Sequence, residues 1–262
     1  MIHAFGDSYT EGQPMDCTFP PFIEWRNYRG GTLPKCWVEL LGDKMGMGTT
    51  NYAQGGNSNY HIFDDVCRNS HKFNKGDIVI INWTYKTRFR WPSFELHSDG
   101  KPKYFDKYGE PSDYWRRMAT NEYEEDYEFI SKDTKNEILT NRMSKLYSDE
   151  IYQYEHLLEQ YSKSKEFEIY FWSTDNEIIY NLPENEFKVK RYLLSDELEL
   201  GTYHNIHMGG DLMSHIIKMG GKTILTETNG VVGDMVHLGE SGHIIQSELF
   251  YDHIVKYNPK LI

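Results

Sequence analysis

Asp77-Ile78-Val79-Ile80-Ile81-Asn82-Trp83 is the segment that most strongly defines the fold of this chain. Its consecutive β-branched residues, Ile78 to Ile81, predict a strand that is buried on both faces. Strands of this kind belong to parallel sheets covered by helices on either side. An α/β fold is therefore expected.

The segments on either side of this strand alternate between strand and helix patterns. Further strands are expected at Met1 to Phe5, Thr49 to Ala53, Phe167 to Trp172 and Lys222 to Thr226. Apolar residues at helical spacing predict helices over 36–45, 59–73, 143–161 and 239–257. The pattern predicts a three-layer α/β/α sandwich around a central, mostly parallel five-stranded sheet.

The whole chain, 1–262, is expected to form a single domain, because no linker divides it. Two irregular stretches, at about 92–135 and 181–218, interrupt the alternation. The first is rich in Pro, Gly, Tyr and charge. We interpret it as an insertion over the carboxyl edge of the sheet, where long loops often bind ligands.

Composition excludes several classes of function. The net charge is −12, which repels phosphate backbones and anionic lipids, so neither nucleic acid nor membrane is expected as a partner. No apolar run is long enough to span a bilayer, and the first residues lack a secretory signal pattern. The three cysteines lack CxxC spacing. We expect a soluble protein, cytoplasmic or part of a larger particle, and leave its oligomeric state open.

The two ends of the chain carry the residue types of nucleophilic catalysis. Gly6-Asp7-Ser8-Tyr9-Thr10-Glu11-Gly12 follows the first expected strand, and Asp234-Met235-Val236-His237 precedes the last expected helix. A serine hydroxyl needs a histidine to accept its proton and a carboxylate to orient that histidine. Ser8, His237 and Asp234 are therefore the candidate catalytic residues.

These motifs resemble the first and last blocks of the SGNH or GDSL hydrolase family, with Tyr9 in place of the usual leucine. The resemblance implies a flavodoxin-like fold and an acyl-enzyme mechanism. It continues in Asn51-Tyr52-Ala53-Gln54-Gly55-Gly56-Asn57-Ser58, where Gly56 matches the glycine whose amide faces the nucleophile. The N–H groups of Ser8 and Gly56 are thus implied to form the oxyanion hole. A turn glycine is the alternative interpretation of Gly56.

The third block departs from the family. Its relatives end the central strand in Gly-x-Asn-Asp and use the asparagine amide as an oxyanion donor, whereas this chain has Ile80-Ile81-Asn82-Trp83-Thr84-Tyr85. An alignment without a gap puts Thr84 at the asparagine position, and a shift by two puts Asn82 there. Loss of such a donor costs about 10²–10³ in turnover, so the departure bears on rate and substrate range.

Other polar residues are weaker candidates. Arg88 would bind a carboxylate or phosphate of the substrate, or form a salt bridge to the acidic surface, and Asn57 is a candidate substrate-binding residue. We expect His243 to be structural. A further group has metal-ligand chemistry but is interrupted by Gly209-Gly210, and we interpret it as surface or pocket-rim residues: His204, His207, Asp211 and His215. No metal and no cofactor is expected.

The resulting expectation is a serine esterase that acts on a small-molecule or carbohydrate ester, with small O-acyl groups on sugars as the preferred class because the insertions are rich in tyrosine. Three alternatives stay open: a non-catalytic binding module that keeps the fold, an acyltransferase of the same fold, and a structural interaction protein that uses its acidic insertions.

Overall fold

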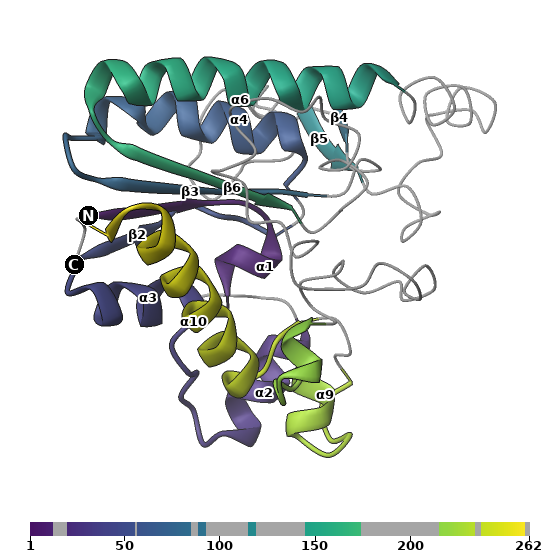
Figure 1. Cartoon of the computed structure of the whole chain (residues 1–262). Helices are drawn as coiled ribbons and strands as arrows, with labels where there is room; N and C mark the ends of the chain where they lie inside the picture. The colour runs from purple at the N-terminus through teal and green to yellow at the C-terminus, as the bar shows by residue number, and fades with distance from the viewer. Residues whose placement is uncertain are drawn as a thin grey trace.

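A parallel four-stranded sheet forms the centre of the protein. The computed structural model describes residues 1–12, 20–55, 57–84, 89–92, 115–118, 145–173, 215–233 and 237–259. Within these, the strands are β1 (Ile2–Phe5), β2 (Thr49–Asn51), β3 (Ile78–Trp83) and β6 (Glu168–Ser173), in the order β2-β1-β3-β6. All three pairings are parallel. The predicted α/β class is confirmed (Figure 1).

Strand β3 is buried on both faces, as the β-branched pattern predicts, and so are β1 and most of β6, whereas β2 is only partly buried. Ile78 pairs with Ile2 and with Glu168, so β3 lies between β1 and β6 in the middle of the sheet. Its side chains alternate between two apolar clusters. Ile78 and Ile80 pack with Trp37 and Phe250 on one face. On the other face lies a second cluster that includes Val79, Ile81, Ile62, Val66 and Leu158.

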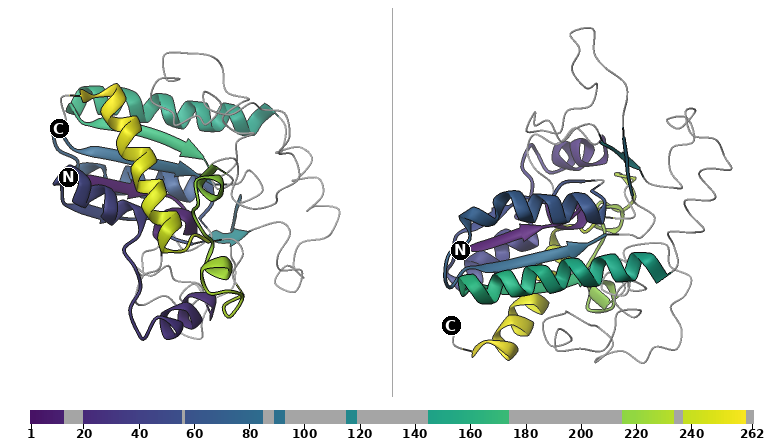
Figure 2. Two further views of the ribbon diagram at one scale, coloured as in Figure 1. Left: turned by 60° about the horizontal axis from the view of Figure 1, so that its bottom comes forward. Right: turned by 90° about the horizontal axis from the view of Figure 1, so that it is seen from above.

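Helices cover both faces of the sheet (Figures 1 and 2). One layer consists of α3 (Trp37–Met45) and α10 (Glu240–Tyr257), which contact each other. The other consists of α4 (Asn59–Asn69) and α6 (Lys145–Lys165). A single 3₁₀ turn, η1 (Ser70–Lys72), continues α4. These four helices, which cover the sheet, thus occur where the helical spacing predicts them.

The expected fifth strand at Lys222 to Thr226 is wrong, and the described part of the sheet has four strands. Only Thr223 forms a bridge, antiparallel to Leu238, and the short helix α9 (Ile224–Glu227) follows it directly. The Thr223 hydroxyl accepts a hydrogen bond from the N–H of Thr226 at 3.3 Å. This N-cap competes with strand pairing and begins a helix instead.

Several short elements lack a sequence prediction. They are α1 (Ser8–Glu11), α2 (Pro20–Tyr28) and a two-stranded antiparallel sheet of β4 (Phe89–Pro92) and β5 (Trp115–Met118). The small sheet lies beyond the carboxyl ends of β3 and β6 (Figure 1). Apart from residues 92, 115–118 and 215–218, the expected insertions at about 92–135 and 181–218 lie outside the described residues.

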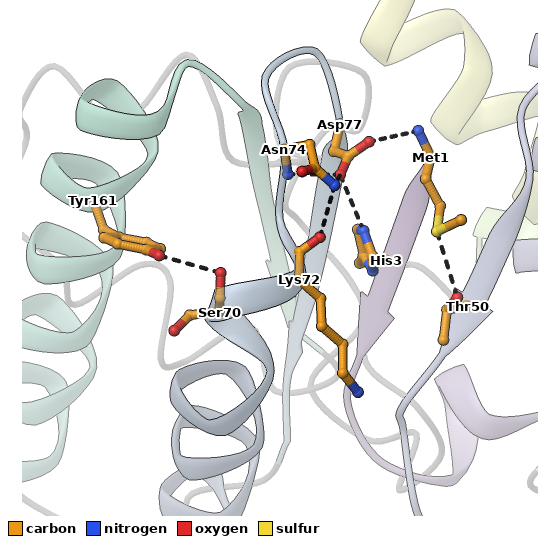
Figure 3. A network of polar contacts seen from close by, with 8 residues as sticks. All are labelled: Met1, His3, Thr50, Ser70, Lys72, Asn74, Asp77 and Tyr161. Atoms are coloured by element: carbon orange, nitrogen blue, oxygen red, sulfur yellow. Dashed lines mark hydrogen bonds and ion pairs between the residues drawn. The ribbon is translucent and has the colours of Figure 1, made fainter.

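A polar network around the buried Asp77 closes the amino edge of the sheet (Figure 3). The Asp77 carboxylate accepts hydrogen bonds from the Met1 ammonium at 2.8 Å and the Asn74 N–H at 2.8 Å, and it lies 3.3 Å from His3 Nε2. Burial works to raise the pKa of Asp77, but these donors outweigh it and lower that pKa. The network joins β1 to the turn before β3, at the edge opposite the candidate site.

Candidate functional site

Ser8 lies at the carboxyl edge of the sheet, as expected, where β1 ends and α1 begins. It is half-buried. Gly6 makes this turn possible, because a Cβ at its position would lie 2.8 Å from the Asn82 Cβ. Within the described part of the chain, the Ser8 hydroxyl and N–H have no hydrogen-bond partner, and no hydrogen bond joins Ser8 to His237.

The fully buried Asp7 carboxylate organises the base of the site. It accepts hydrogen bonds from the N–H of Tyr9 at 3.1 Å, the amide of Asn82 at 2.9 Å and the hydroxyl of Thr84 at 2.5 Å. Both candidates for the third oxyanion donor are thus fully buried and hydrogen-bonded to Asp7. A threonine hydroxyl has a single proton, and that of Thr84 is directed to Asp7 in this structure.

Asn59 holds the end of β3 from the first turn of α4. Its side-chain oxygen accepts from the Thr84 N–H at 2.6 Å, and its amide donates to the Thr84 carbonyl at 2.9 Å. Asn59 therefore pairs with the backbone of Thr84 as a neighbouring strand would. This fixes the distance between α4 and the carboxyl end of β3.

The second motif packs against α1. The Asn51 amide donates to the Thr10 carbonyl at 2.7 Å, and the Gly55 N–H donates to the Glu11 carboxylate at 2.5 Å. A Cβ at Gly55 would lie 3.6 Å from the Cβ of Ser8. The loop after β2 thus reaches the candidate nucleophile. Gly56, the candidate oxyanion donor itself, lies outside the described residues.

Asn57, a candidate substrate-binding residue, is fully buried in this loop. Its amide donates to the Gly6 carbonyl at 3.1 Å and contacts Asp65 at 3.4 Å. These contacts tie the loop to the turn before Ser8. Asn57 thus supports the loop from within.

His237 lies against α1 and α2. Its ring centroid is 5.5 Å from that of Tyr9, the residue after Ser8, and 4.9 Å from that of Phe22. Its carbonyl accepts from the Ile224 N–H at 3.0 Å. The fold thus brings His237 to the helix that Ser8 begins, from the other end of the chain. Asp234 lies outside the described residues.

His243 is buried in α10. Burial, with a smaller contribution from His237, lowers the pKa of His243 to about 3. The ring is therefore neutral at physiological pH. This burial agrees with the structural role expected for His243.

Of the remaining candidates, only His215 lies among the described residues, where its carbonyl accepts a hydrogen bond from the Met219 N–H at 3.0 Å. Arg88, His204, His207 and Asp211 lie outside the described residues. Within the ranges that the structure describes, no group of His, Cys, Asp and Glu residues is arranged to hold a metal ion. Cys36 is buried, which raises the pKa of its thiol to about 11.

Sequence reasoning missed Phe22 and Glu11, which contact the other site residues. The pair Pro20-Pro21 offers a usable signal for Phe22, since proline favours the first turn of a helix and Phe22 and Trp25 are three residues apart. Glu11 has no such signal. Its partner is a backbone N–H that only the folded loop brings near.

Comparisons with known proteins leave the family open. No family model matches the chain, and no curated protein does. Among solved structures, it is similar to a crystal structure of protein YxiM from Bacillus subtilis, with 12% identity and a TM-score of 0.38. The alignment covers 97% of this chain and 56% of the YxiM chain, so this chain spans little more than half of that structure. No helix among the described residues has the length and apolar character needed to cross a membrane.

Proposed function

We propose that this chain is a serine hydrolase of the SGNH type that cleaves an ester through an acyl-enzyme. One observation carries the proposal. Ser8 stands at the carboxyl end of the first strand, and the ring of His237, from the opposite end of the chain, packs on the adjacent Tyr9 at 5.5 Å. Ligand sites of open α/β sheets form at this edge.

In the proposed reaction His237 accepts the proton of the Ser8 hydroxyl as the oxygen attacks the ester carbonyl carbon. The alcohol leaves with that proton and the acyl group stays on Ser8. Water, deprotonated by His237, then attacks the acyl-enzyme and releases the acid, which returns Ser8 to its starting state. We assign two roles to Asp234: it orients the His237 ring and stabilises its charged form.

Backbone N–H groups are the principal oxyanion donors in this proposal. Those of Ser8 and Gly56 are assigned this role from the resemblance, and the hydrogen bonds of Asn82 and Thr84 to Asp7 reduce what either side chain can add. The threonine could donate to the oxyanion only by releasing Asp7. We infer that Asn82, whose amide carries a second proton, is the better side-chain candidate.

The preferred substrate class is a small O-acyl ester of a carbohydrate. The tyrosine-rich sequence of the first insertion, at about 92–135, supports it, since aromatic rings stack on sugars. The insertions follow or precede strands of the main sheet, whose carboxyl edge holds Ser8.

A panel of acetylated sugars and short p-nitrophenyl esters tests the proposal. Ser8→Ala and His237→Ala should each lower turnover by at least about 10³-fold, and the oxyanion donors should leave a small residual rate. Ser164→Ala is the matched control, because this exposed serine bonds only within α6, to the Tyr161 carbonyl at 2.8 Å, and it should retain full turnover. Turnover close to that of the unmodified protein in both site variants would contradict the proposal.

A non-catalytic binding module is the second candidate, and the Asp7 network is the observation that favours it. Both side chains at the third-block position donate to the buried Asp7 carboxylate. Binding of an acetylated sugar by calorimetry without any turnover would support this function. An added alcohol that captures the acyl group in place of water would instead identify an acyltransferase.

A further inference from the structure

Helix α2 contacts both the His237 ring and the elements that carry it. The buried Phe22 ring meets the His237 ring edge-on, with the centroids 4.9 Å apart and the planes at 74°. Phe22 and the fully buried Trp25 form a small apolar cluster with Ile224 and Val232. Figure 1 shows α2 and α9 next to the first turn of α10. The position of α2 therefore fixes one wall of the histidine site.

Arg29, directly after α2, locks this helix to two other elements. One guanidinium nitrogen donates to Glu227 of α9 at 3.1 Å, and another donates to Glu240 of α10 at 2.9 Å. The Arg29 side chain is only 27% exposed and that of Glu227 only 17%, so water screens this pair less than a surface pair. The guanidinium also lies 5.7 Å from the Trp25 ring centroid.

The Glu227 carboxylate and two backbone hydrogen bonds hold the segment that begins at His237. Glu227 accepts the N–H of Glu240 at 2.6 Å and so caps α10 from another helix. Upstream, Ile224 N–H donates to the His237 carbonyl at 3.0 Å, and Gly239 N–H donates to the Lys222 carbonyl at 2.8 Å. Residues 237–240 are thus paired with residues 222–227, and Arg29 joins this pair of segments to α2.

Gly239 shows how closely these segments approach. A Cβ at this position would lie 2.3 Å from a carboxylate oxygen of Glu227. Glu227 is therefore held close against the backbone of Gly239, and the Arg29 guanidinium, which donates to both Glu227 and Glu240, offsets the repulsion between these two carboxylates. Without it, like charges would push α9 and the start of α10 apart.

We propose that Arg29 is a positioning residue for His237, acting through Glu227, Glu240 and helix α2. Only the kinetic consequence of this positioning role rests on the proposed function. A displaced imidazole accepts the Ser8 proton less well, while the substrate-binding surface is unchanged. Arg29 should therefore affect kcat more than KM.

Arg29→Met and Arg29→Lys test this role by steady-state kinetics on the best ester. Arg29→Met removes the charge, and we expect kcat to fall at least about tenfold with KM within about twofold. Arg29→Lys keeps the charge but not the fork that reaches both carboxylates, so its kcat should be intermediate. Arg68→Met is the matched control, because Arg68 forms an exposed pair with Asp64 on α4, and it should match the unmodified protein.

NMR signals of the His237 ring provide a second readout that does not need turnover. They should shift in Arg29→Met and stay in place in Arg68→Met. If the unmodified protein turns over no ester, the proposed function fails, while these signals still decide whether Arg29 fixes His237. Unchanged ring signals and unchanged kcat in Arg29→Met would overturn the proposal. If that variant does not fold, Arg29→Lys and Glu240→Gln decide by the same two measurements.

Discussion

At the scale of single residues, Asp7 is the group on which the candidate site is assembled. Its buried carboxylate joins three parts of the chain: the first turn of α1, Asn82 inside β3 and Thr84 just after it. A buried carboxylate is tolerated only when donors replace its lost hydration. Ser8 is thus held beside a carboxylate whose hydrogen bonds define where β1 and β3 meet α1.

Replacement of Asp7 by asparagine should destabilise the protein. The new amide would oppose the amide of Asn82 or the hydroxyl of Thr84, so at least one buried donor would lose its partner. We expect the free energy of unfolding to fall by about 2–3 kcal/mol, measured by urea denaturation.

Asp43→Asn is the control for this variant, because Asp43 forms an exposed pair with Lys35 and its loss should change stability by less than about 1 kcal/mol. An Asp7→Asn variant as stable as this control would show that the three hydrogen bonds to Asp7 contribute little to folding.

Only some residues of the candidate site could be predicted from the sequence. Ser8 and His237 could be predicted because their motifs follow or precede regular elements with clear patterns. The hydrogen bonds from Asn82 and Thr84 to Asp7 could not be predicted, because these three residues meet only through the pairing of β1 with β3. The role of Arg29 could not be predicted for the same reason, because its partners Glu227 and Glu240 are distant in sequence and meet it only in the fold.

At the scale of elements, α10 links the core to the candidate site. Phe250 and Ile254 in its later turns pack into the cluster on one face of the sheet, and Leu238 just before it joins the same cluster. His243 is buried between these two contacts. Because α10 is anchored at both ends, it fixes the backbone position of His237, which lies just before it.

The burial of His243 predicts a pH-dependent loss of stability. Because its pKa is about 3 in the folded protein and 6.5 for an ordinary, solvated histidine, the unfolded chain binds one more proton between these values. Stability should therefore fall as pH decreases from about 7 to 5. His243 should add up to about 1.4 kcal/mol per pH unit to the slope.

Urea denaturation across this range checks the effect, with His243→Gln expected to show a shallower slope than the unmodified protein. Burial also lowers the pKa of His3, but His3 is present in both proteins and cancels in the comparison. Ser247→Ala, which removes a buried hydroxyl of the same helix, should keep the original slope. Equal slopes in His243→Gln and the unmodified protein would contradict this assignment.

Two predicted strands show which sequence patterns predict secondary structure correctly. Ile78 to Ile81 predicted β3 correctly because a continuous β-branched run suits a strand buried on both faces. Lys222 to Thr226 has a similar apolar and β-branched content, but the Thr223 hydroxyl caps the Thr226 N–H and a helix forms. Side-chain capping outweighed strand propensity there, and the sheet has one described strand fewer than expected.

At the scale of the whole molecule, the net charge affects which esters approach the candidate site. The net charge of −12 produces a field that repels anions over a distance set by ionic strength. Neutral esters, such as acetylated sugars, approach without this penalty. The charge therefore agrees with the proposed substrate class.

Salt should accordingly accelerate the hydrolysis of an anionic ester. We expect kcat/KM for a p-nitrophenyl ester with a free carboxylate to rise several-fold between about 10 mM and about 150 mM salt, while p-nitrophenyl acetate stays constant. A fall for the anionic ester would mean that a local cation controls binding, and Arg88→Met would then show whether this residue supplies it.

Above all, the proposed function requires that Ser8 is a nucleophile activated by His237, and covalent labelling by a fluorophosphonate is its decisive test. Peptide mass mapping after incubation should place one adduct on Ser8. The adduct should be absent from Ser8→Ala, strongly reduced in His237→Ala and unchanged in Ser164→Ala. A folded protein that forms no adduct at Ser8, or forms it equally well without His237, would contradict this assignment of nucleophile and base.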